Sequence, residues 1–294
     1  MGFTIFGTEI RWYGVTIAMA ILVAFSICLY LFKKVGYKES TAFEILLVTV
    51  PISIVGARLF FIMFEGGNFF AFRSGGMVIY GGIIFAAVAL FLYTKFARKI
   101  GYFTVTDIIV IGLILAQAIG RWGNFFNIQG GYYEGYGIAT NGPHIPPFTS
   151  IVRGEPHLSM WFLESLFNLI GFMVLLRIFT RQKKFGTTTA SYMIWYGVLR
   201  TILEALRGDA LYIGANDIFI SRISVLISLG LVIAGCVILF INHKYPRFIN
   251  QSNDNIVETE EDIKKKEESK QKRLERKAEK RAGVKGKESE PEPK

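Results

Sequence analysis

A stripe of ionisable and aromatic side chains lies within an otherwise apolar stretch and could do chemistry. Its members are Tyr196, Arg200, Glu204 and Arg207, at i, i+4, i+8 and i+11, so on a helix they share one face. Ionisable groups inside a membrane-spanning segment are costly and face a cavity or one another. Anion binding is the functional interpretation, and an Arg200–Glu204 ion pair that only holds helices together is the structural alternative.

A second candidate site follows the fourth apolar run, where residues 120–127 read GRWGNFFN. The two glycines allow a ligand to approach the backbone closely, and Asn124 and Asn127 offer neutral donors and acceptors beside Arg121. Gln117, Arg121 and Asn124 share one face if the helix continues. The alternative is an Arg-Trp pair that anchors the helix at the membrane interface.

Charge balance favours anion binding. Arg58, Arg121 and Arg200 are all expected near the same end of the apolar runs, and Glu164 alone cannot neutralise three guanidinium groups. A guanidinium offers a planar fork that binds phosphate or carboxylate through two hydrogen bonds. Aromatic and glycine segments open the first and third runs, Trp12–Gly14 and Val78–Gly82. They are expected to line the same cavity, and the alternative is that they belong to the aromatic belt at the membrane interface.

The elements that must position these residues are membrane-spanning helices. The chain has 294 residues, of which 52% are hydrophobic, and its apolar runs are close to the roughly 20 residues that cross a bilayer. The sequence therefore predicts an all-α polytopic protein of about seven transmembrane helices. The predicted spans are Trp12–Phe32, Phe43–Phe64, Met77–Ala97, Val105–Ile119, Met160–Phe179, Thr188–Leu206 and Phe219–Ile241.

The lysines orient this bundle. Every lysine before the tail falls at the end of, or after, the first, third, fifth or seventh run, while the other connections carry arginine and no lysine. The excess of positive charge marks the cytoplasmic side, so the N-terminus is expected outside and the C-terminus inside.

We expect a membrane domain over residues 1–249, with the active site, and a charged tail over 250–294 that is disordered or a solvated helix. The tail holds 13 basic and 12 acidic residues, so the net charge of +10 belongs almost wholly to the membrane domain. The outer loop 124–159 is rich in Gly, Tyr and Pro and has no evident helix or strand, which is typical of a binding loop. Cys28 and Cys236 are expected to be buried and inert.

Together these segments resemble one family, the prolipoprotein diacylglyceryl transferases. The matching segments occur in the family's order along the whole membrane part and leave out the tail. They are WYG at 12–14, GAR at 56–58, YGG at 80–82, GRWGNFFN at 120–127, FLESLFN at 162–168 and YGVLRTILEALRGD at 196–209.

The resemblance implies an enzyme that moves the diacylglyceryl group of phosphatidylglycerol onto the lipobox cysteine of a prolipoprotein. A thioether would form and glycerol-1-phosphate would leave, as the first step of lipoprotein maturation in a bacterial plasma membrane. It implies no metal, no cofactor and no nucleic acid partner. A transporter for an anionic solute that uses the same buried arginines is the alternative.

The resemblance also implies roles for individual residues. The expected catalytic residues are Arg121, Arg200, Glu204 and Tyr80. The expected substrate-binding residues are Arg121, Asn124, Asn127, Tyr13, Tyr196, Arg207, Gly81 and Arg58.

Two departures from the family pattern leave alternatives open. Tyr80 stands where some members have a histidine, so the general base is open between Glu204, Tyr80 and the leaving phosphate. The stretch after Asn127 is longer than usual, so either Gln129 or Glu134 could take the place of the family's glutamate.

Overall fold

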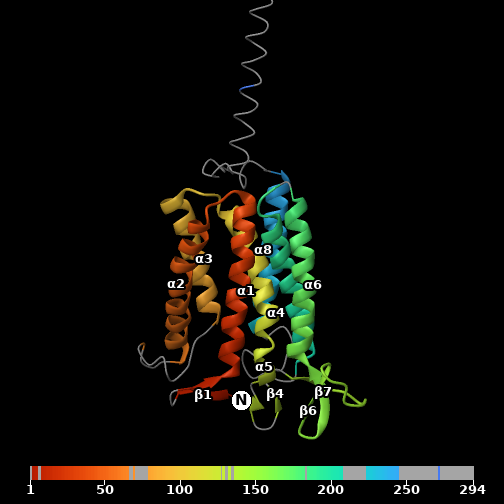
Figure 1. Ribbon diagram of the computed structural model, residues 1–294. Helices are drawn as coiled ribbons and strands as arrows, with labels where there is room; N and C mark the ends of the chain where they lie inside the picture. The colour runs from red at the N-terminus through yellow and green to blue at the C-terminus, as the bar shows by residue number, and fades with distance from the viewer. Residues whose placement is uncertain are drawn as a thin grey trace, which may run out of the picture.

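Helices dominate the computed structural model, and most of them run along a common axis (Figure 1). The structure describes residues 2–5, 8–65, 69, 79–126, 128–129, 132–133, 136–182, 184–207, 223–244 and 271. The helices are α1 Trp12–Val35, α2 Glu39–Glu65, α3 Ile79–Leu92, α4 Tyr102–Gly120, α5 Gly123–Phe126, α6 Met160–Arg181, α7 Thr187–Ala205 and α8 Ile223–Lys244. A π-helical turn, Tyr93–Arg98, extends α3.

Within these described residues, six helical segments are long and apolar enough to cross a membrane, which confirms a polytopic all-α protein. They correspond to α1, α2, α3 with its π-helical turn, α4 with α5, α6 and α8. The sixth predicted span is a helix of 19 residues, α7, but it is not among the six. It carries Arg200 and Glu204, and the two charges lower its hydropathy.

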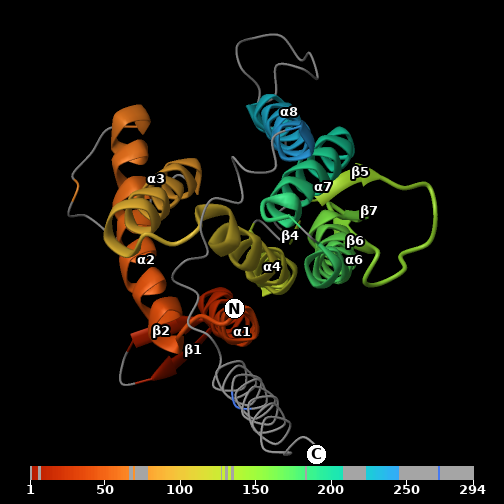
Figure 2. The ribbon, with the colours of Figure 1, turned by 90° about the horizontal axis from the view of Figure 1, so that it is seen from above.

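The helices form two groups joined at the middle of the bundle. Figure 2 shows α2 and α3 side by side at one edge, and α6, α7 and α8 at the other. Helix α4 lies between them and contacts α1, α6 and α7, which makes it the central element. Its buried face includes Val105, Ile108, Ile111 and Ile114.

The connections that carry lysine lie at one end of the bundle. The chain turns there after α1, after the π-helical turn and after α6, and α8 also ends there (Figure 1). The first of these turns begins at Gly36, whose φ of 98° is in the left-handed region that glycine adopts readily. The lysine asymmetry is thus a property of one end of the fold, and its cytoplasmic assignment stays a prediction.

The opposite end carries short antiparallel strands. They are β1 Gly2–Ile5 with β2 Thr8–Arg11, β3 Ile128–Gln129 with β4 Tyr132–Tyr133, and a three-stranded sheet in the order β5 Tyr136–Ala139, β7 Glu155–Ser159, β6 Thr149–Val152. The prediction that 124–159 has no strand was wrong, because these strands are only two to five residues long and lack an alternating pattern that would reveal them.

The surface and the interior of the bundle are those of a protein that faces lipid. Large apolar side chains such as Leu47, Met63 and Ile233 are exposed on helix surfaces, whereas Glu164 and Glu204 are buried. Buried charges require partners inside the protein, so the fold is expected to pair them.

A buried carboxylate joins helices at the lysine end. Asp107 on α4 is fully buried and accepts hydrogen bonds from the backbone N–H groups of Gly186 and Thr189 at 2.8 and 2.7 Å. It also accepts from the Thr189 hydroxyl at 2.6 Å and from Gln182 Nε2 at 3.0 Å. One side chain of α4 therefore satisfies the free N–H groups at the start of α7.

We expect Asp107→Ala to lower the free energy of unfolding by about 3 kcal/mol, since each buried donor left without a partner costs about 1–3 kcal/mol. Thermal unfolding in detergent measures the change. The exposed Glu155, replaced by Ala, is the control and is expected to leave the midpoint unchanged. An Asp107→Ala midpoint equal to the wild type would refute this role.

Candidate active site

A cavity of about 290 Å³ lies between the helices near the strand-bearing end. Helices α1, α4, α5, α6 and α7 all contribute to its wall. The lining residues are Tyr13, Ile17, Ala20, Ile21, Ala116, Gln117, Gly120, Arg121, Asn124, Asn168 and Tyr196. The predicted shared face of Gln117, Arg121 and Asn124 is confirmed, because all three line this one cavity.

Arg121 is the charged group of the cavity wall. It follows the end of α4, where its N–H donates to the Gln117 carbonyl at 3.1 Å, and its side chain remains 31% accessible. Its Nε lies 2.5 Å from Glu164 Oε2. Its two terminal nitrogens make no hydrogen bond to a described residue, so the outer edge of the fork can receive an anion from the cavity.

Glu164 is shared by two arginines. Its other oxygen, Oε1, accepts from Arg200 Nη1 at 2.7 Å, and Arg200 Nη2 lies 3.1 Å from Glu204 Oε2. The ionic network is therefore Arg121–Glu164–Arg200–Glu204, with two charges of each sign. The expectation that Glu164 leaves the arginines unneutralised was wrong for this pair, since α6 supplies one carboxylate and α7 another within reach of Arg200.

The arginine at 121 is held in place by its neighbours in the GRWGNFFN segment. Trp122 Nε1 donates to Ser165 Oγ at 3.0 Å, and Ser165 Oγ donates to the Ala118 carbonyl at 2.7 Å. This chain of bonds fixes the end of α4 to α6 beside Glu164. The Trp122 ring also packs edge-on against Trp161 at 5.2 Å.

Gly123 allows α1 to pack close to the cavity that Arg121 lines. A Cβ at Gly123 would lie 2.9 Å from the ring of Tyr13, so only glycine lets that ring reach the cavity wall. Tyr13 and Tyr196 thus face one cavity from α1 and α7, and their role in substrate binding stays a prediction.

Two amide side chains in the wall were not predicted as site residues. Gln117 Nε2 donates to the Tyr192 hydroxyl at 3.0 Å, while its Oε1 has no partner among the described residues. Asn168 is 3% exposed, and its Oδ1 also lacks a partner in the described part of the chain. Asn168 belongs to the segment FLESLFN. A sequence does not show which hydrogen-bond partners an amide has in the fold, so Asn168 could not be recognised as a site residue.

Arg58 and Gly81 lie elsewhere. Arg58 is 1% exposed, its Nε donates to the Phe69 carbonyl at 3.1 Å, and its guanidinium lies over Phe61 at 5.3 Å. Neither Arg58 nor Gly81 lines the cavity of Arg121. Gly81 instead packs against α2, where a Cβ would lie 2.5 Å from the Gly56 carbonyl oxygen.

Gly81→Ala is therefore expected to separate α2 from α3 and to cost about 1–3 kcal/mol of stability, as overpacking does. Thermal unfolding in detergent checks this. Gly230→Ala is the matched control, because no atom lies within 4 Å of a Cβ at that position on α8. Equal midpoints for the two variants would show that the contact tolerates a methyl group.

Other predicted residues are only partly placed. The backbone of Arg207 pairs with Gly137 in β5, next to a hydrogen bond of 2.9 Å from Ile138 N to the Leu206 carbonyl. Arg207 does not line the cavity. The predictions on the side chains of Tyr80, Asn127, Gln129 and Glu134 lie outside the described residues.

The cysteines take no part in this site. Cys28 is half-buried and its Sγ lies 3.7 Å from the Ile108 carbonyl oxygen, while Cys236 is exposed on α8. Both are free thiols. The expectation of burial was wrong for Cys236, which lies on the outer apolar face of its helix.

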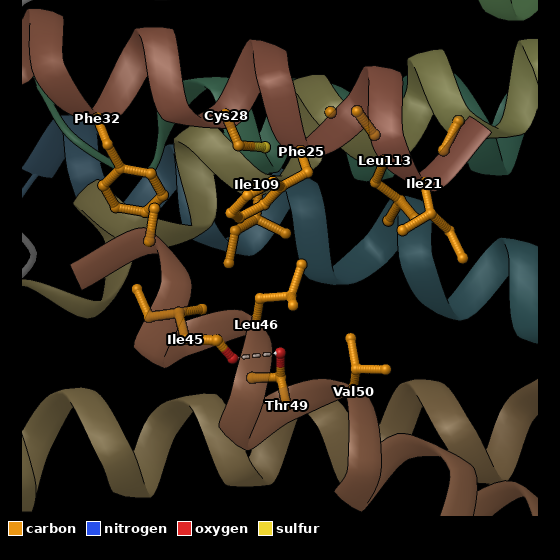
Figure 3. Close-up of a pocket in the computed structure, with 14 residues that line it drawn as sticks. Ile21, Phe25, Cys28, Phe32, Ile45, Leu46, Thr49, Val50, Ile109 and Leu113 are labelled. Atoms are coloured by element: carbon orange, nitrogen blue, oxygen red, sulfur yellow. Dashed lines mark hydrogen bonds between the residues drawn. The ribbon is translucent and has the colours of Figure 1, made fainter. Parts of the chain in front are cut away.

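A second cavity, of about 200 Å³, adjoins the first and is lined almost wholly by apolar side chains. The two share Ile21 and Ala116. Figure 3 shows Phe25, Cys28 and Ile109 on one side and Leu46 and Val50 on the other pointing toward each other across the gap between α1, α4 and α2. The Thr49 hydroxyl donates to the Ile45 carbonyl at 2.7 Å, so it adds no free polar group to this wall.

The comparisons with known proteins agree with this geometry. The sequence pattern of the family described as "Prolipoprotein diacylglyceryl transferase" matches residues 1–241. A phosphatidylglycerol–prolipoprotein diacylglyceryl transferase of Finegoldia magna is 37% identical over 252 residues, 83% of this chain and 95% of that protein.

Proteins of the same name from Enterococcus faecalis and Clostridioides difficile are 36% and 33% identical, over 85% and 86% of this chain and 94% and 97% of theirs. These matches give no support to the alternative of an anion transporter. They extend over nearly the whole of each relative and include every helix that builds the two cavities. The chain belongs to the prolipoprotein diacylglyceryl transferase family.

Proposed function

We propose that this membrane transferase moves the diacylglyceryl group of phosphatidylglycerol to the lipobox cysteine thiol of a prolipoprotein. The observation that carries the proposal is the position of Arg121, which lines a polar cavity that adjoins an apolar one. A lipid with an anionic head and apolar chains suits this pair of cavities, which a small hydrophilic anion would not fill.

The reaction is a displacement at carbon. The thiol sulfur of the prolipoprotein forms a bond to the glyceryl carbon that carries the phosphate, and the bond from that carbon to the phosphate oxygen breaks. Glycerol-1-phosphate leaves with the bonding electrons, and the thiol proton passes to a base. The nucleophile belongs to the substrate, so the free thiols of Cys28 and Cys236 have no catalytic task.

Arg121 has the role of stabilising the leaving group. Negative charge grows on the phosphate oxygen as the bond to carbon breaks, and a guanidinium fixed beforehand lowers the energy of that state. Glu164 holds Arg121 through Nε alone, at 2.5 Å, which leaves the other edge for the phosphate. Asn124 in the same wall supplies a neutral donor.

Arg200 acts through Glu164. Two carboxylates hold it at 2.7 and 3.1 Å, and it does not line the cavity. We therefore assign Arg200 and Glu204 to positioning Glu164, and through it Arg121. We do not assign the general base to Glu204, because it does not line the cavity and is held by Arg200 at 3.1 Å. The departing phosphate takes the thiol proton in this scheme.

The apolar cavity suits an acyl chain. Along α1 it extends from Ile21 to Phe32, which is roughly 16 Å at the helical rise of 1.5 Å per residue. Burial of methylene groups there contributes about 0.8 kcal/mol each, so a chain in this groove would hold the lipid while the reaction proceeds.

The protein is a multi-pass membrane protein, and we assign it to a bacterial plasma membrane. The strand-bearing end, with the active site, faces outward in this assignment, and the lysine end faces the cytoplasm. Residues 1–249 form the catalytic membrane domain and 250–294 a peripheral tail.

The test is incubation of the purified protein with labelled phosphatidylglycerol and a lipobox peptide. We expect a thioether-linked diacylglyceryl peptide and stoichiometric glycerol-1-phosphate, and a peptide with Ser in place of the cysteine should give neither. Lack of both products, with folded protein and intact substrates, would refute the function.

A further inference from the structure

A layer of neutral hydrogen-bonding side chains lies one helical turn deeper in the bundle than the ionic network. On α4, Gln117 precedes Arg121 by four residues, and on α6, Asn168 follows Glu164 by four. On α7, Tyr196 precedes Arg200 by four. Because α4 and α7 run toward the strand-bearing end and α6 runs away from it (Figure 1), the neutral residue of each pair lies deeper in the bundle.

This layer also lies between Arg121, at the charged end of the polar cavity, and the apolar cavity. Gln117, Asn168 and Tyr196 all line the polar cavity, whose deep side is formed by Ile21 and Ala116. Those two residues also line the apolar cavity. Going inward from Arg121, a ligand therefore meets a guanidinium, then neutral amide and hydroxyl groups, and then hydrocarbon.

The hydrogen-bonding capacity of this layer is largely unused within the protein. Neither the Asn168 amide nor the Tyr196 hydroxyl has a hydrogen bond to a described residue, although Asn168 is only 3% exposed. The Gln117 amide has one partner, the Tyr192 hydroxyl. That hydroxyl can donate as well as accept, so the amide can turn over, keep this bond and present its N–H groups to the cavity.

We propose that Asn168, with Tyr196 and Gln117, binds the ester carbonyls of the diacylglyceryl group that is transferred. In a glycerophospholipid the three-carbon glyceryl backbone separates the phosphate from the ester carbonyls, a distance comparable with one helical turn of about 5 Å. With the phosphate on Arg121, the carbonyls reach the neutral layer and the chains enter the apolar groove. A carbonyl oxygen accepts hydrogen bonds from neutral N–H and O–H groups, and the layer offers such donors.

The proposal rests on the proposed function and refines it, since it makes these three residues selective for a diester over a diether lipid. Neither ester reacts, so a dialkyl ether analogue of phosphatidylglycerol keeps the bond that breaks and loses only the two carbonyl acceptors. The test compares kcat/KM and equilibrium binding for the diester and diether lipids in detergent. The wild type is expected to favour the diester about 10- to 100-fold, at about tenfold per lost hydrogen bond.

Asn168→Leu should reduce this preference about tenfold. Its kcat/KM and binding affinity for the diester should fall, while those for the diether stay within about threefold of the wild-type values. Asn168→Ser, which keeps a donor, should restore part of the preference. Asn242→Leu is the matched control, because Asn242 is also a buried amide with an unpaired Oδ1, on α8 at the lysine end. It is expected to lower stability without a change in preference.

Three results would overturn the proposal. The wild type could show the same kcat/KM and affinity for the diester and the diether. Asn168→Leu could lower the kcat/KM and affinity for both lipids in the same proportion, as a structural defect would. Asn168→Leu could also change only the preference for phosphatidylglycerol over phosphatidylmethanol, which would mean that the layer binds the headgroup and not the ester carbonyls. Binding is measured separately from turnover, so an inactive wild type that binds the diester selectively would sink the proposed reaction and leave the ester contact supported.

Discussion

Replacing Arg121 by Ala is expected to lower kcat/KM for phosphatidylglycerol by about a thousandfold, with a folded protein. A single preorganised donor to a developing oxyanion is worth about 10²–10³ in rate, and Arg121 offers the only guanidinium in the wall formed by described residues. Its loss leaves Glu164 paired with Arg200, so the buried carboxylate keeps a partner and stability should change little.

Two further variants separate the effect of charge from that of geometry. Arg121→Lys keeps the charge but not the planar fork, so we expect about 10- to 100-fold less activity than the wild type. Arg153→Asn removes an arginine from the β6–β7 turn, where its φ of 52° is one that asparagine tolerates, and should leave kcat/KM unchanged. Wild-type turnover by Arg121→Ala would mean that the phosphate binds elsewhere.

Replacing Arg200 by Ala should have the second largest effect, and on two quantities at once. It removes one partner of Glu204 and one partner of Glu164, both of which are buried, so we expect a loss of about 3–5 kcal/mol in the free energy of unfolding. It also frees Glu164 to draw Arg121 away from the cavity, so kcat/KM should fall at least a hundredfold. Unfolding and turnover are measured on the same preparation.

A double variant tells positioning from simple destabilisation. Arg200→Met with Glu204→Gln removes one charge of each sign from the network and should recover most of the lost stability. If Arg200 acts by positioning Glu164, turnover stays low in this stable protein. Recovery of both stability and turnover would show that Arg200 serves the fold alone.

Much of the fold could be predicted because the apolar runs have the length that a bilayer imposes. The six helices that could cross a membrane lie close to predicted spans, and α7 begins within one residue of its prediction. The face shared by Gln117, Arg121 and Asn124 followed from the helical period alone. The charged stripe on α7 also indicated that one face of this helix is turned toward other helices, and Arg200 on that face contacts Glu164 of α6.

The parts that could not be predicted depend on contacts between distant segments. Which arginine Glu164 would meet is decided by the packing of α4, α6 and α7, and a sequence does not give distances between helices. Arg58 is an arginine like Arg121 and Arg200, but it lies on α2, where its guanidinium lies over Phe61 and not in the cavity of Arg121. The amide of Asn168 could be distinguished from an ordinary buried asparagine only once its lack of a partner was known.

The balance of charge in the Arg121–Glu164–Arg200–Glu204 network has a consequence for turnover. A phosphodiester lipid carries one negative charge. The phosphomonoester also carries one when it has taken the thiol proton, and closer to two once that proton is lost at neutral pH. Two carboxylates already offset the two guanidiniums, so nothing in this quartet compensates the additional charge. In the proposed mechanism, loss of that proton would therefore favour departure of the spent headgroup into water, and the network that binds the lipid would also help to release the product.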